Sequence, residues 1–375
     1  MKPVHFFRLS LPLIAALALA GCLDDSGGSD DDTRTGSLAI NGFSGVGYVT
    51  ASRTGETDTE GHFEYYPGET VSFYIGDLAL ATDVPAKEYV TPPEFFSETR
   101  EKLDIPGTDD EGLRTHTLTE QALLSNTALI NLTRLLLALA WEENLQDDEG
   151  IEIRDRVVRQ LNAALPNLTA PIDFNVSEEA FTSAGSGSEP ASPANQLLAA
   201  ICFYPEDDEL CEDPPPQSEI DALPPRPENE EDRDPDVEYQ EDLQAKRDRI
   251  LEAVRSLEDF DQEAAEDYLT RELNAITTVY GNRFYLNDET ATHAESETEL
   301  QQVDIRRVGG DPGLARIEAI SSREQDVMVH SFDWQSATVE YFVTGPAGGE
   351  AEVIISFRPE ETYRWIRKSL RVIIR

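Results

Sequence analysis

An acidic, proline-rich block at residues 205–238 most constrains how this chain of 375 residues can fold. The block reads PEDDELCEDPPPQSEIDALPPRPENEEDRDPDVE and contains eight prolines. Proline has no amide hydrogen to donate within a helix or a sheet. A segment so rich in carboxylates also has too little apolar area to build a core. We therefore predict an extended linker or loop over 205–238, with separately folded regions on either side.

The first 21 residues have the pattern of an export signal. Lys2 and Arg8 precede the apolar run LSLPLIAALALA, which is shorter than the roughly twenty residues that a membrane-spanning helix needs. The run ends in LAGC at 19–22, which resembles the lipobox of bacterial lipoproteins. The resemblance implies that residues 1–21 are removed and that Cys22 carries acyl chains, such as palmitate, that anchor the protein in a membrane. An ordinary cleaved signal with an incidental cysteine is the alternative.

Residues 22–36, CLDDSGGSDDDTRTG, follow as a predicted flexible acidic tether. Glycine, serine and aspartate bury little apolar area, and like charges extend the chain. In the lipoprotein family, an aspartate directly after the cysteine favours retention at the inner membrane. Leu23 stands there in this chain, so the resemblance implies an outer-membrane lipoprotein on the periplasmic or the surface face.

The charge balance excludes one class of partner. Asp and Glu number 74 against 30 Lys and Arg, which gives a formal net charge of −44. A field of this sign repels nucleic-acid phosphates, so we expect no nucleic-acid partner. An acidic, lysine-poor surface suits a salty exterior in which ions screen self-repulsion. A cation-binding surface is the alternative interpretation.

Two cysteines remain after Cys22, and both lie in CFYPEDDELC. Outside the cytoplasm such a pair is expected to oxidise, so we predict a disulfide between Cys202 and Cys211. A metal site would need further Cys or His ligands close by in the sequence, and this segment has none.

Residues 37–110 are predicted to form a β-sandwich-like module, because β-branched and aromatic runs alternate with Gly, Asp and Pro turns. The stretch GETDTEGHFEYYPGETVSFYIGD at 55–77 resembles small prealbumin-like modules similar to carboxypeptidase regulatory domains. It also resembles the opening segment of bacterial surface lipoproteins of unassigned role. The matching positions are Thr57, Asp58, Gly61, Phe63 and Gly68. Turn chemistry explains each of them, so the resemblance implies a fold and no activity.

Aromatic residues of this module are the candidate ligand-binding side chains. On an exposed face, Tyr65, Tyr66 and Tyr74 could stack on a sugar or on another apolar ligand. Alternation along a strand places Phe63 and Tyr65 on one face and Tyr66 on the other. About half of these aromatic side chains must therefore belong to the core.

Residues 111–204 change to a helical period. Thr117 and Glu120 have capping-box spacing and open TLTEQALLSNTALINLTRLLLALAW. Leucines recur on nearly every side of this stretch, which predicts a deeply buried helix. Polar residues such as Asn131 and Arg134 argue against a membrane span.

The acidic turn at 147–150 resembles the turn after this helix in the same lipoproteins, where some relatives have a calcium-type loop. A calcium loop needs oxygen ligands at alternate positions before its glycine. Here Asp147, Asp148 and Glu149 are consecutive, and Leu145 falls at the first ligand position. We predict a solvated turn and no metal ligand.

The chain after the acidic block is predicted to contain a helical pair at 239–281 and an antiparallel β-sheet of about six strands at 282–375. The final run, TYRWIRKSLRVIIR, concentrates basic residues. We expect it to dock against the protein's own acidic face; contact with lipid headgroups is the alternative.

Signatures of catalysis are missing from the sequence. His62, His116, His293 and His330 follow the export signal outside any HExxH pattern, and we expect His330 to be a hydrogen-bonded sheet histidine. Neither GxSxG nor a nucleotide-binding glycine pattern occurs. We predict no catalytic residue, no metal ligand and no cofactor. Among 74 acids, sequence alone cannot select a pair suited to glycoside hydrolysis.

The sequence therefore predicts an α+β protein with an N-terminal β-sandwich-like module, a helical middle region and a C-terminal antiparallel sheet. We expect a lipid-anchored cell-envelope protein with a noncatalytic binding, adhesion or structural role, and an envelope protein or glycan as its partner. The alternatives are a secreted carboxylate-dependent hydrolase acting on polysaccharide and an accessory component of an envelope transport assembly.

Overall fold

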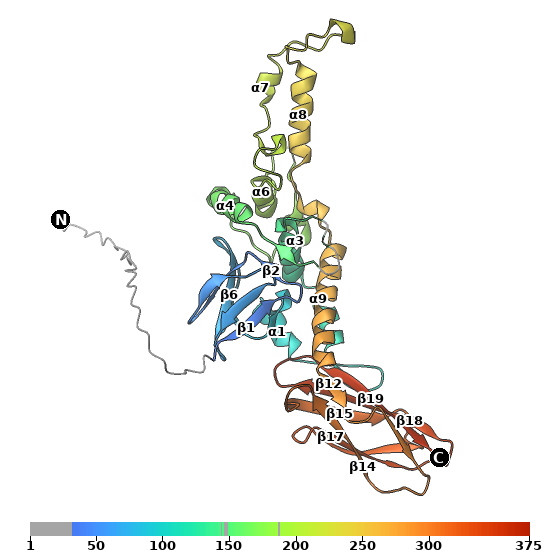
Figure 1. Cartoon of the computed structure of the whole chain (residues 1–375). Helices are drawn as coiled ribbons and strands as arrows, with labels where there is room; N and C mark the ends of the chain where they lie inside the picture. Colours follow the sequence, from blue (N-terminus) through green and yellow to red (C-terminus); the bar gives the residue numbers. More distant parts are fainter. Residues whose placement is uncertain (1–31, 144, 146–148, 187) are drawn as a thin grey trace, which may run out of the picture. The chain divides into compact units, whose positions relative to one another are not determined.

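A computed structural model describes residues 32–143, 145, 149–186 and 188–375, and Thr33–Arg375 form one compact unit. The fold is α+β as predicted: strands come first, helices occupy the middle and antiparallel strands complete the chain (Figure 1). Cys22, the export signal and most of the tether lie outside the described residues, as do Asp147 and Asp148.

The N-terminal module contains two small sheets, ordered β5-β1-β8 and β4-β3-β6-β7. The strands are β1 (Arg34–Leu38), β3 (Gly47–Thr50), β4 (Thr54–Glu56), β5 (His62–Tyr65), β6 (Thr70–Ile75), β7 (Leu78–Pro85) and β8 (Tyr89–Val90). Phe63 and Phe73, one from each sheet, meet edge to face with ring centroids 5.3 Å apart. The module begins earlier than predicted, because Arg34 and Gly36 of the expected tether pair with Tyr65 and Phe63 in β1.

The predicted single helix from Thr117 is two helices, α2 (Thr117–Leu123) and α3 (Thr127–Leu139), bent by 77°. His116, and not Thr117, occupies the cap position of α2. The side chain of Asn126 accepts a hydrogen bond from the Leu129 amide, so a second helix start interrupts the leucine-rich run.

Helix α3 lies in a hydrophobic core that it shares with the N-terminal strands, which we call the first core. Residues 128–139 are all buried, as predicted. Within the described residues, no single helix has the length and apolar character to cross a membrane; α2 and α3 meet those limits only as the bent pair. The surrounding elements are η1 (Pro92–Glu94), α1 (Ser97–Leu103), β9 (Gly107–Thr108), β10 (Arg114–Thr115), α4 (Asp155–Ala164), η2 (Leu165–Asn167), α5 (Glu178–Thr182) and α6 (Pro193–Ala199). A short parallel pair, β2 (Phe43–Ser44) with β11 (Ile151–Glu152), ties the helical region to the N-terminal module.

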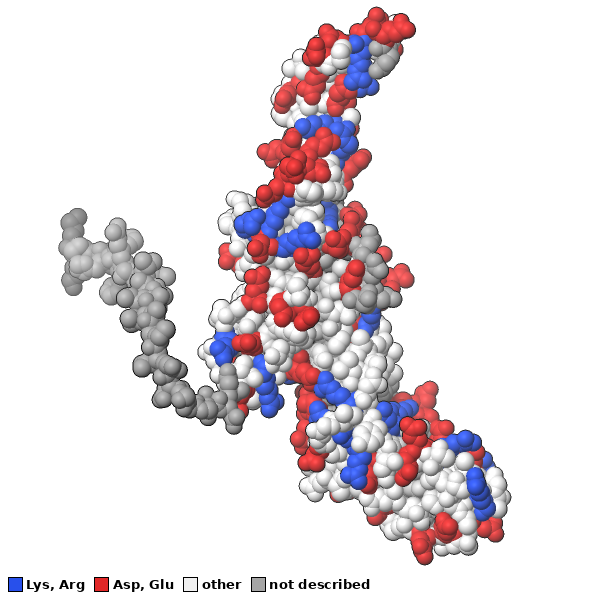
Figure 2. All heavy atoms as spheres, viewed as in Figure 1, with Lys and Arg blue, Asp and Glu red and all other residues white. Residues whose placement is uncertain are grey.

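The acidic block at 205–238 is more ordered than a linker. It contains η3 (Glu209–Cys211), α7 (Gln217–Ile220) and η4 (Glu230–Asp232), and it packs along α8 (Gln240–Glu252) (Figure 1). Basic side chains of α8 pair with its acids: Lys246 with Glu212 at 2.5 Å, and Arg249 with Glu209 at 2.8 Å. Acidic side chains otherwise dominate this part of the surface in Figure 2. The bases of α8 therefore lie against acids of the block, in ion pairs that are partly or largely exposed and that add little stability.

Helix α9 (Gln262–Asn282), which follows η5 (Leu257–Asp259), joins the two larger hydrophobic cores of the described residues. Ala265 and Leu269 pack in the first core with α3, and Ile276 and Tyr280 pack in the second core with the C-terminal strands. The predicted helical pair is therefore present, and its second member links regions that the sequence treats as separate.

The C-terminal region contains eight strands in two four-stranded sheets, where the sequence predicted one sheet of about six. The strands are β12 (Phe284–Leu286), β13 (Thr290–His293), β14 (Gln301–Arg307), β15 (Leu314–Ser321), β16 (Val327–Asp333), β17 (Thr338–Val343), β18 (Glu350–Pro359) and β19 (Ile366–Ile374). The sheets are ordered β12-β14-β17-β16 and β13-β19-β18-β15. Pairing is antiparallel except between β13 and β19, which are parallel. Two sheets form because the core face of each must be covered by apolar residues of the other.

The basic C-terminal run forms β19 and the segment before it. Arg367 pairs with Asp109 and, at 2.8 Å, with Glu111, and Arg371 pairs with Glu350 at 2.6 Å. These contacts confirm the prediction that the run docks against acids of the same chain.

Candidate functional site

Four polar residues meet where the start of α2 packs against the segment before β19. We call His116, Glu120, Tyr363 and Arg364 the polar junction; all four are buried. His116 and Glu120 are four residues apart, so both project from the same side of the helix start. The chain between β18 and β19 brings Tyr363 and Arg364 to that side.

Both ring nitrogens of His116 form hydrogen bonds. Its Nδ1 accepts a hydrogen bond from the Trp365 amide at 3.0 Å, so Nε2 carries the proton and donates to the Thr277 hydroxyl at 3.0 Å. Burial, with the charge of Arg364 nearby, lowers the pKa of His116 to about 3. The imidazole is therefore neutral and held in one tautomer.

Glu120 binds the other two members of the junction. Its carboxylate accepts a hydrogen bond from the Tyr363 hydroxyl at 2.7 Å and lies 3.5 Å from the Arg364 guanidinium. Burial raises the pKa of Glu120, and Arg364 partly opposes that shift. Burial also raises the pKa of Tyr363. Shifts of this kind occur at catalytic sites and in structural ion networks. Here the groups bind one another, which supports the structural interpretation.

A charged cavity of about 380 Å³ lies beside the junction. We call it the acidic cavity; its charged lining residues are Lys87, Glu94, Arg100, Glu101, Asp104, Arg358, Glu360 and Glu361. Glu94 pairs with Lys87 and accepts the Thr91 amide at 2.9 Å. Glu361 pairs with Arg307 at 2.8 Å. Two of its five carboxylates therefore already hold the surrounding structure together.

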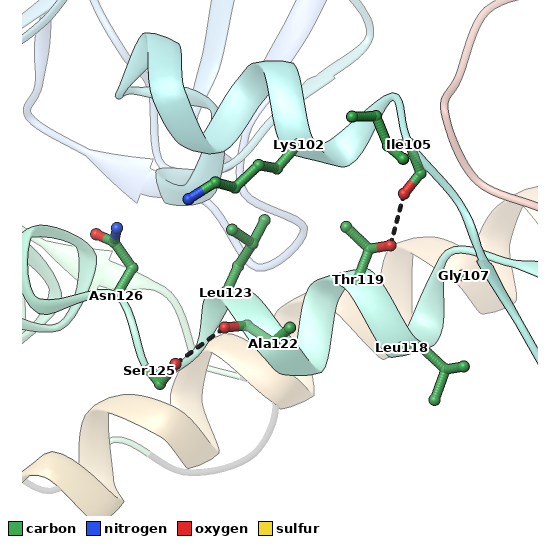
Figure 3. A pocket seen from close by; sticks show the side chains of 9 residues that line it. All are labelled: Lys102, Ile105, Gly107, Leu118, Thr119, Ala122, Leu123, Ser125 and Asn126. Atoms are coloured by element: carbon green, nitrogen blue, oxygen red, sulfur yellow. Dashed lines mark hydrogen bonds between the residues drawn. The ribbon is translucent and has the colours of Figure 1, made fainter.

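A mainly apolar cavity of about 620 Å³ lies between α1 and α2. We call it the α1–α2 cavity (Figure 3). Its apolar lining side chains are Ile105, Leu118, Ala122 and Leu123, and Lys102 and Asn126 are among its polar ones. A second cavity of about 620 Å³ lies beside α5 and α6, where Ile172, Val176 and Phe181 contribute to its lining.

One set of potential metal ligands in the described residues was not singled out from the sequence. Donor atoms of Asp58, Glu60 and His62 lie within 4.8 Å of one another. The Asp58 carboxylate also accepts the Glu60 and His62 amides, each at 2.9 Å. These residues stand at every second position, and this spacing in the sequence could have indicated the set. Their contacts to one another hold the exposed turn before β5.

The predicted tyrosine platform is corrected by the structure. Tyr65 is 5% exposed and packs on Phe63 with ring centroids 5.7 Å apart, so it belongs to the core. Tyr66, which follows β5, is half-buried beneath the Arg53 guanidinium. Tyr74 is half-buried on β6 of the other sheet. Tyr65 is therefore not part of an exposed stacking surface, whereas ligand binding by Tyr66 and Tyr74 stays a prediction.

The other predicted sites have different outcomes. Cys202 and Cys211 form a disulfide. Lipidation of Cys22 remains a prediction, because that residue lies outside the described residues. His330 lies on β16 as expected but is exposed, with its ring 6.3 Å from that of Phe342. His330 is therefore a sheet histidine, as predicted, and it faces solvent. The buried His293 has a ring nitrogen 3.1 Å from the Tyr341 hydroxyl.

No family model matches the sequence, and no curated protein matches it either. Among solved structures, domains 4 and 5 of the S-layer protein SbsC align with a TM-score of 0.19 and 12% identity, covering 24% of this chain and 50% of that one. Domains 1–6 of SbsC align with a TM-score of 0.18 and 11% identity, covering 24% of this chain and 13% of that one. The aligned part spans at most half of either chain, and similarity this slight assigns neither a fold nor a function.

Proposed function

We propose that this protein is a lipid-anchored, noncatalytic binding protein of the bacterial cell envelope, held at the outer membrane through Cys22. One contrast among the described residues carries the proposal. His116 and Tyr363, whose pKa values burial shifts strongly, are enclosed within the fold, where the Tyr363 hydroxyl donates to Glu120 and His116 accepts the Trp365 amide. The two largest cavities described above are instead lined mainly by apolar side chains. Such cavities suit binding more than acid–base chemistry.

The location rests on two independent features. The LAGC sequence at 19–22 resembles a lipobox. The disulfide between Cys202 and Cys211 suits an oxidising compartment outside the cytosol. An acidic tether after Cys22 would let the folded unit reach an envelope protein or glycan some distance from the membrane.

The anchor is tested by mass spectrometry of the amino-terminal peptide from a bacterial host, compared with a Cys22→Ser variant. We expect acyl chains on Cys22, and release of the variant from the membrane fraction. An unmodified thiol at position 22 in a membrane-free protein overturns the anchoring. The binding role is tested by titrating purified protein with envelope glycans and measuring the change in thermal stability.

The acidic cavity supports a second candidate function, polysaccharide hydrolysis by a pair of carboxylates. Glu101 and Glu360 line it and are exposed. Release of reducing ends from envelope polysaccharide, abolished by Glu101→Gln or Glu360→Gln, would establish this function in place of the noncatalytic one. Equal activity in the variants and the parent protein would remove this cavity from consideration.

A further inference from the structure

The α1–α2 cavity is a preformed groove between two fixed elements. The Thr119 hydroxyl of α2 donates to the Ile105 carbonyl at 2.7 Å, which attaches the loop after α1 to the helix (Figure 3). Gly107 brings the same loop against α2, because a β-carbon on this glycine would lie 2.8 Å from Leu118 Cβ. The groove therefore does not depend on a loop closing over it.

The apolar side of the groove is left uncovered by the bend between α2 and α3. Ser125 donates to the Ala122 carbonyl at 3.0 Å at this corner, and α3 leaves at 77°. Leu118 and Ala122, four residues apart and thus on the same side of α2, remain exposed. On the opposite side, Ile105 is 67% exposed, against 44% for Leu118. Two large apolar side chains thus face solvent in one groove.

A positive charge lies at this apolar groove. Lys102 extends from α1 along the cavity toward the end that Asn126 lines (Figure 3). It is one of only five lysines in a chain of net charge −44. Lys102 donates to Glu98 at 2.7 Å, and both side chains are at least half exposed. Ion pairs this exposed contribute little, so an anionic ligand can compete for the ammonium.

We propose that the α1–α2 cavity binds a single-chain fatty acid, with Lys102 pairing its carboxylate and Ile105 and Leu118 contacting its acyl chain. The inference rests on the proposed binding function and names the ligand class. A volume of about 620 Å³ lies in the range of roughly 300–1,000 Å³ typical of pockets that enclose one small ligand.

The test uses residues 23–375, which contain the whole compact unit and lack the export signal and the acylated cysteine. Laurate, dodecyltrimethylammonium and dodecyl maltoside, each below its micelle concentration, are titrated by calorimetry. We expect one laurate per chain, with at least tenfold weaker binding of the cationic and neutral amphiphiles. Shortening the fatty acid should weaken binding about fourfold per methylene.

Two variants assign the binding to this cavity. Lys102→Gln should weaken laurate about tenfold through loss of the charge pair, and Leu118→Ser should do so through loss of apolar contact. Lys246→Gln and Leu251→Ser are matched controls on α8, where Leu251 is 47% exposed, and should bind like the parent protein. Thermal unfolding checks that each variant is folded.

Three outcomes would overturn the inference: no saturable laurate binding, equal affinity for all three amphiphiles, or laurate affinity unchanged in both cavity variants. Binding to anionic lipid vesicles that requires Leu118, without binding of free laurate, would assign the groove to a membrane surface instead. The anchor and hydrolase assays above use different readouts. If laurate does not bind, while Cys22 is acylated and no hydrolysis is found, only the proposed ligand class is rejected and the proposed function stands.

Discussion

Glu272 of α9 holds Asn41 of the N-terminal module across 231 residues of sequence. The Glu272 carboxylate accepts the Asn41 side-chain amide at 2.7 Å and the Asn41 backbone amide at 3.2 Å. It also accepts the Ile40 amide at 2.9 Å. Burial raises the pKa of this carboxyl, and these hydrogen bonds oppose the shift. One buried carboxylate thus fixes the long helix that joins the two cores.

We predict that Glu272→Ala lowers the free energy of unfolding by about 2–4 kcal/mol, because it leaves buried amides without an acceptor. Glu272→Gln retains one acceptor oxygen and should lose less. Urea unfolding followed by circular dichroism measures both, with the exposed Glu263→Gln on the same helix as the control. A Glu272→Ala loss no larger than that of the control would contradict the role of this contact.

The polar junction predicts a pH dependence of stability. Folding lowers the pKa of His116 from 6.5 to about 3, so between these values the unfolded chain binds one more proton than the folded chain. Stability from this group is complete above pH 6.5 and is lost as the pH falls toward 3, by up to about 1.4 kcal/mol per pH unit.

The measurement compares urea unfolding of the parent protein and His116→Gln from pH 7 to pH 4. We expect a shallower pH slope in the variant, because the titrating group is gone. His330→Gln, at an exposed strand position, should keep the parent slope. Glu120 changes stability with pH in the opposite direction, because folding raises its pKa, and its contribution therefore falls as the pH rises. Parallel pH profiles for parent and His116→Gln would show that His116 is not the titrating group.

The disulfide predicts a redox dependence. Cys202 and Cys211 are nine residues apart, and a closed loop of this length stabilises the folded chain by about 2.5 kcal/mol through the entropy of the unfolded state. The Cys202→Ser, Cys211→Ser double variant should lose that amount. Reduction should lower the melting temperature of the parent and leave the variant unchanged. If reductant also lowers the melting temperature of the double variant, the effect does not come from the Cys202–Cys211 disulfide.

The tyrosines of the N-terminal module predict a contrast between neighbours. Tyr65→Ala should destabilise the protein by about 3 kcal/mol, because it empties a core position beside Phe63. Tyr66→Ala, at a half-buried position, should lose about 1 kcal/mol or less. Thermal and urea unfolding distinguish them. Similar losses for the two variants would mean that strand alternation does not govern this module.

Local patterns made several features predictable. Apolar residues alternate with period two at 339–343, a pattern typical of a strand, and the structure contains β17 there, with Val339, Tyr341 and Val343 buried. Ala265, Leu269 and Leu273 recur with helical spacing in the sequence, and they lie on the buried side of α9. His116 and Glu120 are four residues apart, and this helical spacing could have indicated that the two side chains lie together in the polar junction. Nothing local marks Arg364 as its fully buried partner, because the contact depends on where β19 lies.

The sequence alone determined the order of strands, helices and strands, the disulfide and the acidic surface. Hydrophobic periodicity and charge are properties of short stretches, and the two cysteines are only nine residues apart. Tertiary structure decided the division of the last strands into two sheets, the burial of Tyr65 and the groove beside Lys102. Each of these depends on which distant surfaces must cover one another. His116 and Trp365, 249 residues apart, meet only in the folded chain.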